Sequence, residues 1–188
     1  INVFDYNSIT QLVSNVNYIA GAFDWTSLLN VTNFQLKLAP ELTSVLSPIT
    51  STVMTNFSVT YSGIATLDIS GLTGLGGVFK ANDNYSLKDL TLPSSGEAFS
   101  LFDVSKCSLI NYFDLTPLIH ITEINNVIID FTDCSLSAAS MNQFLTDIDS
   151  ISSGFNTGRQ ILMAGTNSAP DTTSGGFNGA VAKANHFQ

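Results

Sequence analysis

The sequence predicts an α/β solenoid, in which short parallel strands stack at a pitch of about 23 residues between helical caps. Three observations lead to this fold class. Four segments share one order of apolar and polar residues, a small hydrogen-bonding residue recurs in them at a nearly constant interval, and a second series of apolar pairs runs between them. The length of 188 residues is that of one domain, 1–188.

The four segments are residues 54–64, 76–87, 99–109 and 126–136. Each reads apolar, polar, apolar, two polar residues and then a small hydrogen-bonding residue. That residue is Ser62, Asn84, Cys107 or Cys134, so the first two intervals are nearly equal and the last one is longer by a short insertion. Repeats of this length are typical of stacked supersecondary units, so we expect one strand per repeat.

A second extended side is expected in each repeat, because short apolar alternations fall between the four segments. They are Leu67 with Ile69, Leu90 with Leu92, and Phe113 with Leu115, and they recur with the same pitch as the segments themselves.

These segments resemble the leucine-rich-repeat consensus, and residues 99–109 and 126–136 fit it best. Residues 31–42, with Ala39 in place of the Asn or Cys, form a weaker earlier repeat. A side chain at the bend after each strand has to satisfy buried backbone groups of the turn, which explains a ladder of Ser62, Asn84, Cys107 and Cys134. The two cysteines are then free thiols that point inward; a disulfide between them and a metal site are the alternatives.

The two ends are expected to be caps, residues 1–30 and 137–188, on either side of repeats in 31–136. Apolar residues at helical spacing from Ile9 to Ile19 predict an amphipathic helix that begins at Asn7 or Ser8 and ends near Gly21. A second helix is predicted after Ser137 as N-cap, followed by a strand at 160–164 and a closing helix near 176–185. This order is similar to the C-terminal end of leucine-rich-repeat-like modules in bacterial surface proteins and bacteriophage structural proteins.

Composition excludes some functions. Charged residues make up 11% of the chain, the formal net charge is −9, and no stretch concentrates the six Lys and Arg, so we expect no nucleic-acid partner. No segment is long and apolar enough to span a membrane, so we expect no membrane insertion. Neither His120 nor His186 stands in a metal or triad motif, and residues 71–77 lack the Lys-Ser/Thr ending of a phosphate loop. We therefore expect no catalytic residues, no metal and no cofactor.

One polar face remains as a candidate site. Alternation along the strands predicts an outward face of three columns of side chains. They are Ser58, Lys80, Asp103 and Asp130, then Thr60, Asn82, Ser105 and Thr132, and beyond them Tyr61, Asp83, Lys106 and Asp133. The face is a plain solvated surface, a binding face for a protein or glycan, or the carrier of a glycosidase carboxylate pair. Asp103 and Asp130 would lie roughly 5 Å apart, which also allows a calcium ion.

The resemblance and the missing catalytic motifs together imply a non-enzymatic, extracellular recognition or adhesion module on a bacterial surface or a phage particle. It would bind through the polar strand face. The alternative is a purely structural virion or filament subunit that assembles through the same surfaces.

Overall fold

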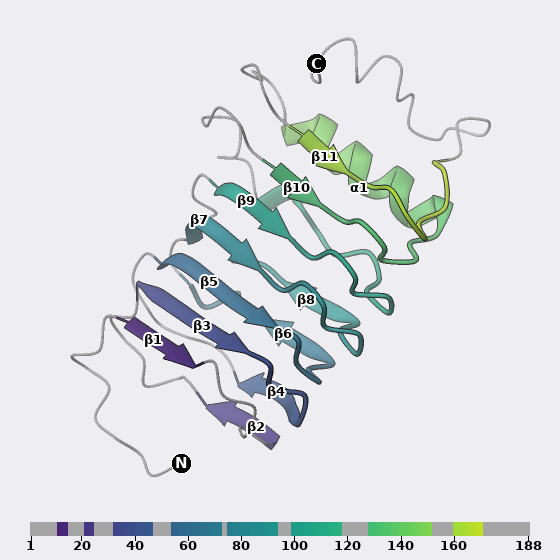
Figure 1. The fold of residues 1–188 in the computed structure, drawn as a ribbon. Helices are drawn as coiled ribbons and strands as arrows, with labels where there is room; N and C mark the ends of the chain where they lie inside the picture. The colour runs from purple at the N-terminus through teal and green to yellow at the C-terminus, as the bar shows by residue number, and fades with distance from the viewer. Residues whose placement is uncertain are drawn as a thin grey trace.

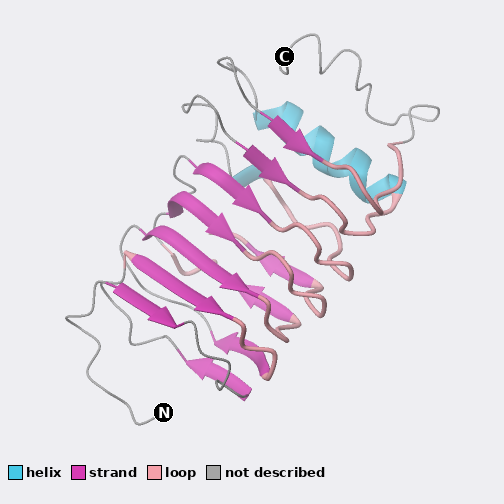
Figure 2. Ribbon diagram, in the orientation of Figure 1, coloured by secondary structure: helices cyan, strands magenta, loops and turns pink. Residues whose placement is uncertain are grey.

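The computed structural model describes residues 11–14, 21–24, 32–46, 54–72, 75–93, 99–117, 128–151 and 160–170. Within them the chain forms short strands and one α-helix, α1 (Ala138–Ile151) (Figure 2). The strands are β1 (Gln11–Ser14), β2 (Gly21–Asp24), β3 (Asn33–Lys37), β4 (Leu42–Leu46), β5 (Met54–Thr60), β6 (Thr66–Asp68), β7 (Leu75–Lys80), β8 (Asp89–Thr91), β9 (Phe99–Asp103), β10 (Ile128–Asp130) and β11 (Gln160–Leu162).

The strands form two stacked parallel sheets. The large sheet has the order β1-β3-β5-β7-β9-β10-β11, and the small sheet has the order β2-β4-β6-β8. From β1 to β8 the chain alternates between the two sheets, so each strand lies beside the next strand of its own sheet (Figure 1). The architecture is thus α/β with short parallel strands, as predicted.

The strand register reproduces the spacing of the sequence pattern. Phe34 is aligned with Phe57, Phe57 with Phe79, and Phe79 with Phe102, so one phenylalanine per repeat shares a single position. Phe102 is then aligned with Ile129, which is a longer step along the chain. The insertion that interrupts the sequence pattern therefore lies between two strands and leaves their register intact.

The core contains inward-facing side chains of both sheets and of α1. Phe34, Phe57, Phe79 and Phe102 are completely buried and stack face to face along the large sheet, with ring centroids 5.5, 5.4 and 4.8 Å apart. Aromatic pairs in this arrangement contribute about 0.5–1.5 kcal/mol each beyond the area that they bury. One apolar position per repeat thus builds a continuous column.

A second column lies at the turn that follows each strand of the large sheet. Here a polar side chain donates to the main-chain carbonyl of the preceding repeat, and the pairs are Asn84 Nδ2 to Val59 O (2.6 Å), Cys107 Sγ to Ala81 O (3.0 Å), Cys134 Sγ to Val104 O (3.1 Å) and Asn167 Nδ2 to Phe131 O (2.7 Å). Ser62 takes part through its amide and hydroxyl, which both donate to Asn84 Oδ1. These contacts satisfy backbone groups that the turn removes from water.

The turn itself has a constant conformation. The residue before Ala39, Ser62, Asn84, Cys107 and Cys134 has a φ between 54° and 59°, and these residues are Leu38, Tyr61, Asp83, Lys106 and Asp133. Side chains other than glycine rarely adopt this left-handed conformation, so its recurrence marks a strained turn that the ladder contacts hold in place.

The predicted N-terminal helix is wrong over the residues that the structure describes there. Residues 11–14 form β1, which pairs in parallel with β3, and residues 21–24 form β2, which pairs with β4. The apolar spacing fits a helix, but the segment is rich in valine, isoleucine and asparagine, which favour helices weakly, and a free sheet edge offers ladder hydrogen bonds. The remainder of the predicted helix, and the predicted closing helix at 176–185, lie outside the described residues.

At the C-terminal end, the predicted helix and the strand after it are present as α1 and β11. The Ser137 hydroxyl accepts a hydrogen bond from the Ser140 amide at 3.1 Å, which is the contact of an N-cap. In Figure 1, α1 lies behind β10 and β11. Phe144 of α1 stacks on Phe131 with 4.8 Å between ring centroids.

The expected extended side at Phe113–Leu115 is not a strand. Phe113 and Leu115 are buried, but α1 covers this repeat in place of a neighbouring strand. The Phe113 and Phe144 rings form a T-shaped pair with 5.0 Å between their centroids, and the Leu115 amide donates to the buried Asp147 carboxylate at 3.4 Å. The helix therefore supplies the contacts that the small sheet supplies to the earlier repeats.

Candidate functional site

The first predicted column of outward residues is brought together by the strand register. Ser58 on β5 is aligned with Lys80 on β7, Lys80 with Asp103 on β9, and Asp103 with Asp130 on β10. All four side chains are half-buried. Gln35 on β3 extends the column in the other direction, because it is aligned with Ser58.

The second predicted column reaches the surface only in part. Thr60 and Ser105 are 6% and 8% exposed, whereas Asn82 and Thr132 are half-buried. The predicted outward position of Thr60 and Ser105 thus leaves them largely buried. All four residues of this column stand directly before the left-handed residue of a turn, so this position alone does not decide their exposure. The Ser105 hydroxyl donates to the Asp103 carboxylate, which holds the Ser105 side chain against its neighbour.

At the acidic end of the face, the carboxylates accept hydrogen bonds from the turns that follow their own strands. The Asp103 carboxylate accepts hydrogen bonds from the Ser105 amide (3.0 Å) and hydroxyl (2.7 Å), and Asp130 accepts from the Thr132 amide (2.8 Å). Burial raises the pKa of Asp103, the bonds from Ser105 oppose that rise, and the charge of Asp130 adds to it. These carboxylates have a structural role in closing the turns.

The same contact recurs in the chain, which supports the structural role. The Asp68 carboxylate accepts from the Ser70 amide at 2.9 Å, and Asp114 accepts from the Thr116 amide at 2.8 Å. Both of these aspartates lie away from the polar face, so an aspartate two residues before a Ser or Thr is a turn element of this fold.

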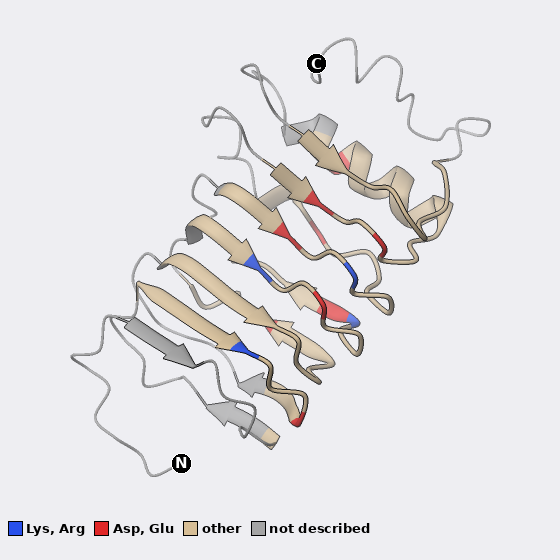
Figure 3. Cartoon of the chain, in the orientation of Figure 1, with Lys and Arg blue, Asp and Glu red and all other residues tan. Residues whose placement is uncertain are grey.

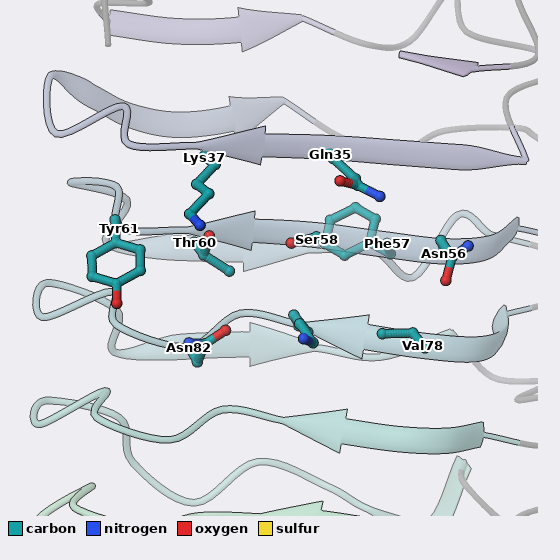
Figure 4. Close-up of a pocket in the computed structure, with 10 residues that line it drawn as sticks. Gln35, Lys37, Asn56, Phe57, Ser58, Thr60, Tyr61, Val78 and Asn82 are labelled. Atoms are coloured by element: carbon teal, nitrogen blue, oxygen red, sulfur yellow. The ribbon is translucent and has the colours of Figure 1, made fainter. Parts of the chain in front are cut away.

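The other end of the face contains a hollow, which we call the polar hollow. It spans β3, β5 and β7, has a volume of about 370 Å³, and is lined by Gln35, Lys37, Asn56, Phe57, Ser58, Thr60, Tyr61, Val78, Lys80 and Asn82. In Figure 4, Lys37 extends from β3 toward β5, where Ser58 and Thr60 lie, and Tyr61 and Asn82 lie toward one end. Most of the lining is hydroxyl and amide, and no carboxylate of a described residue contributes to it.

Charge thus divides the large sheet into two halves. Figure 3 shows basic segments on β3 and β7 and acidic segments on β9 and β10. Lys37 and Lys80 lie at the polar hollow, whereas Asp103 and Asp130 lie on the strands beyond it.

A second hollow, of about 440 Å³, lies at the turns beside the polar hollow. Its lining includes Leu38, Tyr61 and Tyr85, which are 39%, 41% and 58% exposed. Tyr61 contributes to the lining of both hollows.

The ladder cysteines offer no reactive group to either hollow. Both are free thiols and fully buried. Burial raises the pKa of Cys107 well above its ordinary value and that of Cys134 to about 12, so both stay protonated. Within the described parts of the chain, no three His, Cys, Asp or Glu side chains gather as a metal site would need, and no helix is long and apolar enough to cross a membrane.

Sequence reasoning misses three of the polar residues that line the polar hollow, and these are Gln35, Lys37 and Asn56. Gln35 and Lys37 belong to the weak repeat at 31–42, and they occupy the columns of Ser58 and Thr60. Extending the pattern from Phe34 and Leu36 would have found them. Asn56 lies two residues before Ser58 on the same strand, before the first predicted column. Tyr61 belongs to the third predicted column, and it is the left-handed residue of its turn.

Comparisons of the chain with protein-family models, with curated protein sequences and with solved structures give no match.

Proposed function

We propose that the chain is a leucine-rich-repeat-like solenoid module that works without enzymatic activity outside the cytoplasm, displayed on a bacterial surface or a phage particle. It binds a glycan or a protein through the outward face of the large sheet. The observation that supports this most is the polar hollow over β3, β5 and β7. Exposed sheet faces of stacked repeats are common partner surfaces.

The repeat architecture supports the solenoid part of the proposal. Neighbouring strands of the large sheet are related by a nearly constant offset along the chain over three successive pairs, and one ladder contact to the same carbonyl position recurs from repeat to repeat. An apolar column and a polar ladder that recur with the same period are what stacked repeats require.

The location of the binding surface follows from the division of the face. The acidic half is engaged in turn contacts, whereas the basic half combines a hollow with uncharged hydrogen-bonding groups. A concave site with a few convergent polar groups is the usual form of a ligand site. The hollow has lysines and no described carboxylate in its lining, which favours binding over acid-base hydrolysis.

Blocking the hollow tests the proposal. In Ser58→Trp, an indole occupies the floor of the hollow, so binding to a glycan array and to a protein array should fall at least about tenfold. Thr66→Trp is the matched control, because Thr66 is exposed on β6 of the small sheet. Equal urea midpoints for the two variants would show that both fold. A ligand that Ser58→Trp still binds like the wild type would exclude the polar hollow as the site.

A structural subunit is the second candidate. Among the described residues, β1 and β11 are the outermost strands of the large sheet, and a parallel edge can pair with another chain. Such a subunit would bind nothing on either array and would associate with itself.

A further inference from the structure

We infer that the polar hollow binds the carboxylate of an acidic sugar unit, such as a uronic or sialic acid, between Lys37 and Lys80. The inference rests on the proposed function and names the class of ligand for that site. It is argued from the distribution of charge, from the position of the two lysines, and from the uncharged groups around them.

The distribution of charge is unequal. The chain has six Lys and Arg against fifteen Asp and Glu. Two of the six line one hollow, and no carboxylate is among the described residues that line it. A local excess of positive charge in an acidic chain attracts an anion to that place and repels it elsewhere.

The two lysines lie on either side of one strand. Lys37 on β3 is aligned with Thr60, and Lys80 on β7 is aligned with Ser58, two residues earlier on β5. Standard strand spacing and rise put their Cα atoms about 12 Å apart. A lysine side chain reaches roughly 6 Å from its Cα atom. Both ammonium groups can therefore contact one small anion above Ser58 and Thr60.

Neither ammonium group forms a salt bridge with a described residue, although burial raises the pKa of Asp103 and the charge of Lys80 acts to lower it. Lys106, by contrast, is paired with Asp83 at 3.6 Å. The carboxylate nearest to Lys80 in the register is Asp103 on the next strand, and its Oδ1 atom accepts two hydrogen bonds from Ser105. A ligand carboxylate would give both lysines a counter-ion and form charge-assisted hydrogen bonds with them.

The uncharged lining suits the rest of a sugar. Gln35, Asn56 and Ser58 supply amide and hydroxyl groups to the hollow. Asn82 also lines the hollow, and its Nδ2 atom donates to Asp83 at 2.6 Å. Tyr61, at one end, offers an exposed ring for the C–H face of a sugar.

An acidic peptide fits this place less well. Extended peptides bind sheets by adding a strand at an edge, where main-chain groups are free. The hollow lies in mid-sheet, and β5 already pairs with β3 and with β7. Only side chains can contact a ligand there, which favours a ligand rich in hydroxyl groups.

Isothermal titration of the whole chain with short saccharides tests the inference. The acidic probes are trigalacturonate and 3′-sialyllactose, the neutral probes are maltotriose and lactose, and triglutamate is the peptide probe. We expect one acidic saccharide to bind at least about tenfold more tightly than its neutral counterpart, and less tightly at high salt. Lys37→Gln and Lys80→Gln should each weaken that binding about tenfold. Lys88→Gln, an exposed charge change near β8, should leave it within about twofold.

Several results would overturn the inference. They are equal affinity for neutral and acidic saccharides, unchanged affinity in the Lys37→Gln/Lys80→Gln double variant, tighter binding of triglutamate, or no binding of either acidic saccharide. The proposed function fails separately, when Ser58→Trp leaves binding on the arrays unchanged. A neutral saccharide that binds the wild type and both lysine variants but not Ser58→Trp would support the outward face of the large sheet as the binding surface. That result would exclude an anion site between Lys37 and Lys80.

Discussion

At the scale of single residues, the ladder is the feature that sequence reasoning locates most fully. Spacing alone places Ser62, Asn84, Cys107 and Cys134, and all four lie at the same turn position. Asn167 is missed because its turn has one extra residue, with Gly165 at a φ of 83°. A pattern of fixed spacing does not find a position that a bulged turn has shifted.

Asn84 should contribute more to stability than any exposed asparagine. Its side chain contacts Val59 O, Ala81 O and the Ser62 amide, all of them buried. Asn84→Ala leaves these groups without partners, and each such group costs about 1–3 kcal/mol, so we expect a loss of about 3 kcal/mol or more in urea unfolding. Asn111→Ala, at an exposed position, is the control. A loss below about 1 kcal/mol at Asn84 would mean that the ladder is not a stabilising element.

The ladder thiols should be inert in the folded chain. Cys107 and Cys134 are buried and protonated, so a thiol reagent should label neither before unfolding and both after it, without reductant. No labelling after unfolding would indicate a disulfide.

Because burial raises the pKa values of the Cys107 and Cys134 thiols above the ordinary 9.0, the unfolded chain loses these protons at a lower pH than the folded chain does. Stability should therefore fall as the pH rises from about 9 toward 12.

At the scale of elements, strands with the repeat pattern are predicted well and the chain ends less well. Alternation with a fixed apolar column specifies β5, β7 and β9 because one face of each strand is buried. The segment at 11–14 has the apolar spacing of a helix, but it lies at an open sheet edge and forms β1. The spacing of apolar residues within a segment does not show which neighbour the segment will pair with. That neighbour determines whether such a segment forms a helix or a strand.

Substitutions at two glycines distinguish two causes of lost stability, an unfavourable backbone conformation and a steric clash of the added Cβ atom. Gly77 of β7 and Gly21 of β2 have φ values of 72° and 79°. A Cβ atom at Gly77 would collide with the Thr55 carbonyl, whereas no atom of a described residue lies within 4 Å of one at Gly21. Gly21→Ala should cost about 1–2 kcal/mol from conformation alone, and Gly77→Ala at least about 2 kcal/mol more. Similar losses in thermal unfolding would contradict the close approach of β5 and β7.

At the scale of the whole molecule, the candidate site can be predicted only in outline. The outward columns follow from alternation, so the face itself is foreseeable. Its division into an acidic half engaged in turns and a basic half with a hollow is not, because it depends on which side chains the turns bury. Ser105 and Thr60 lie in an outward column and are nevertheless buried.

The proposed display outside a cell requires that copies of the chain stay apart in solution. The chain is rich in Asn, Ser and Thr, and the net charge of −9 keeps copies of the chain apart. A recognition module needs its large sheet free, whereas a structural subunit needs its edges or faces covered by neighbours. The two functions therefore predict different masses in solution.

The solution mass of the purified chain, measured by light scattering over a series of concentrations, tests this account most directly. We expect a mass of 20.1 kDa, or a small fixed multiple of it, at every concentration. The large sheet would then be accessible to a partner. Open-ended growth of the mass with concentration would contradict a displayed recognition module and would show a subunit that assembles through its own surfaces.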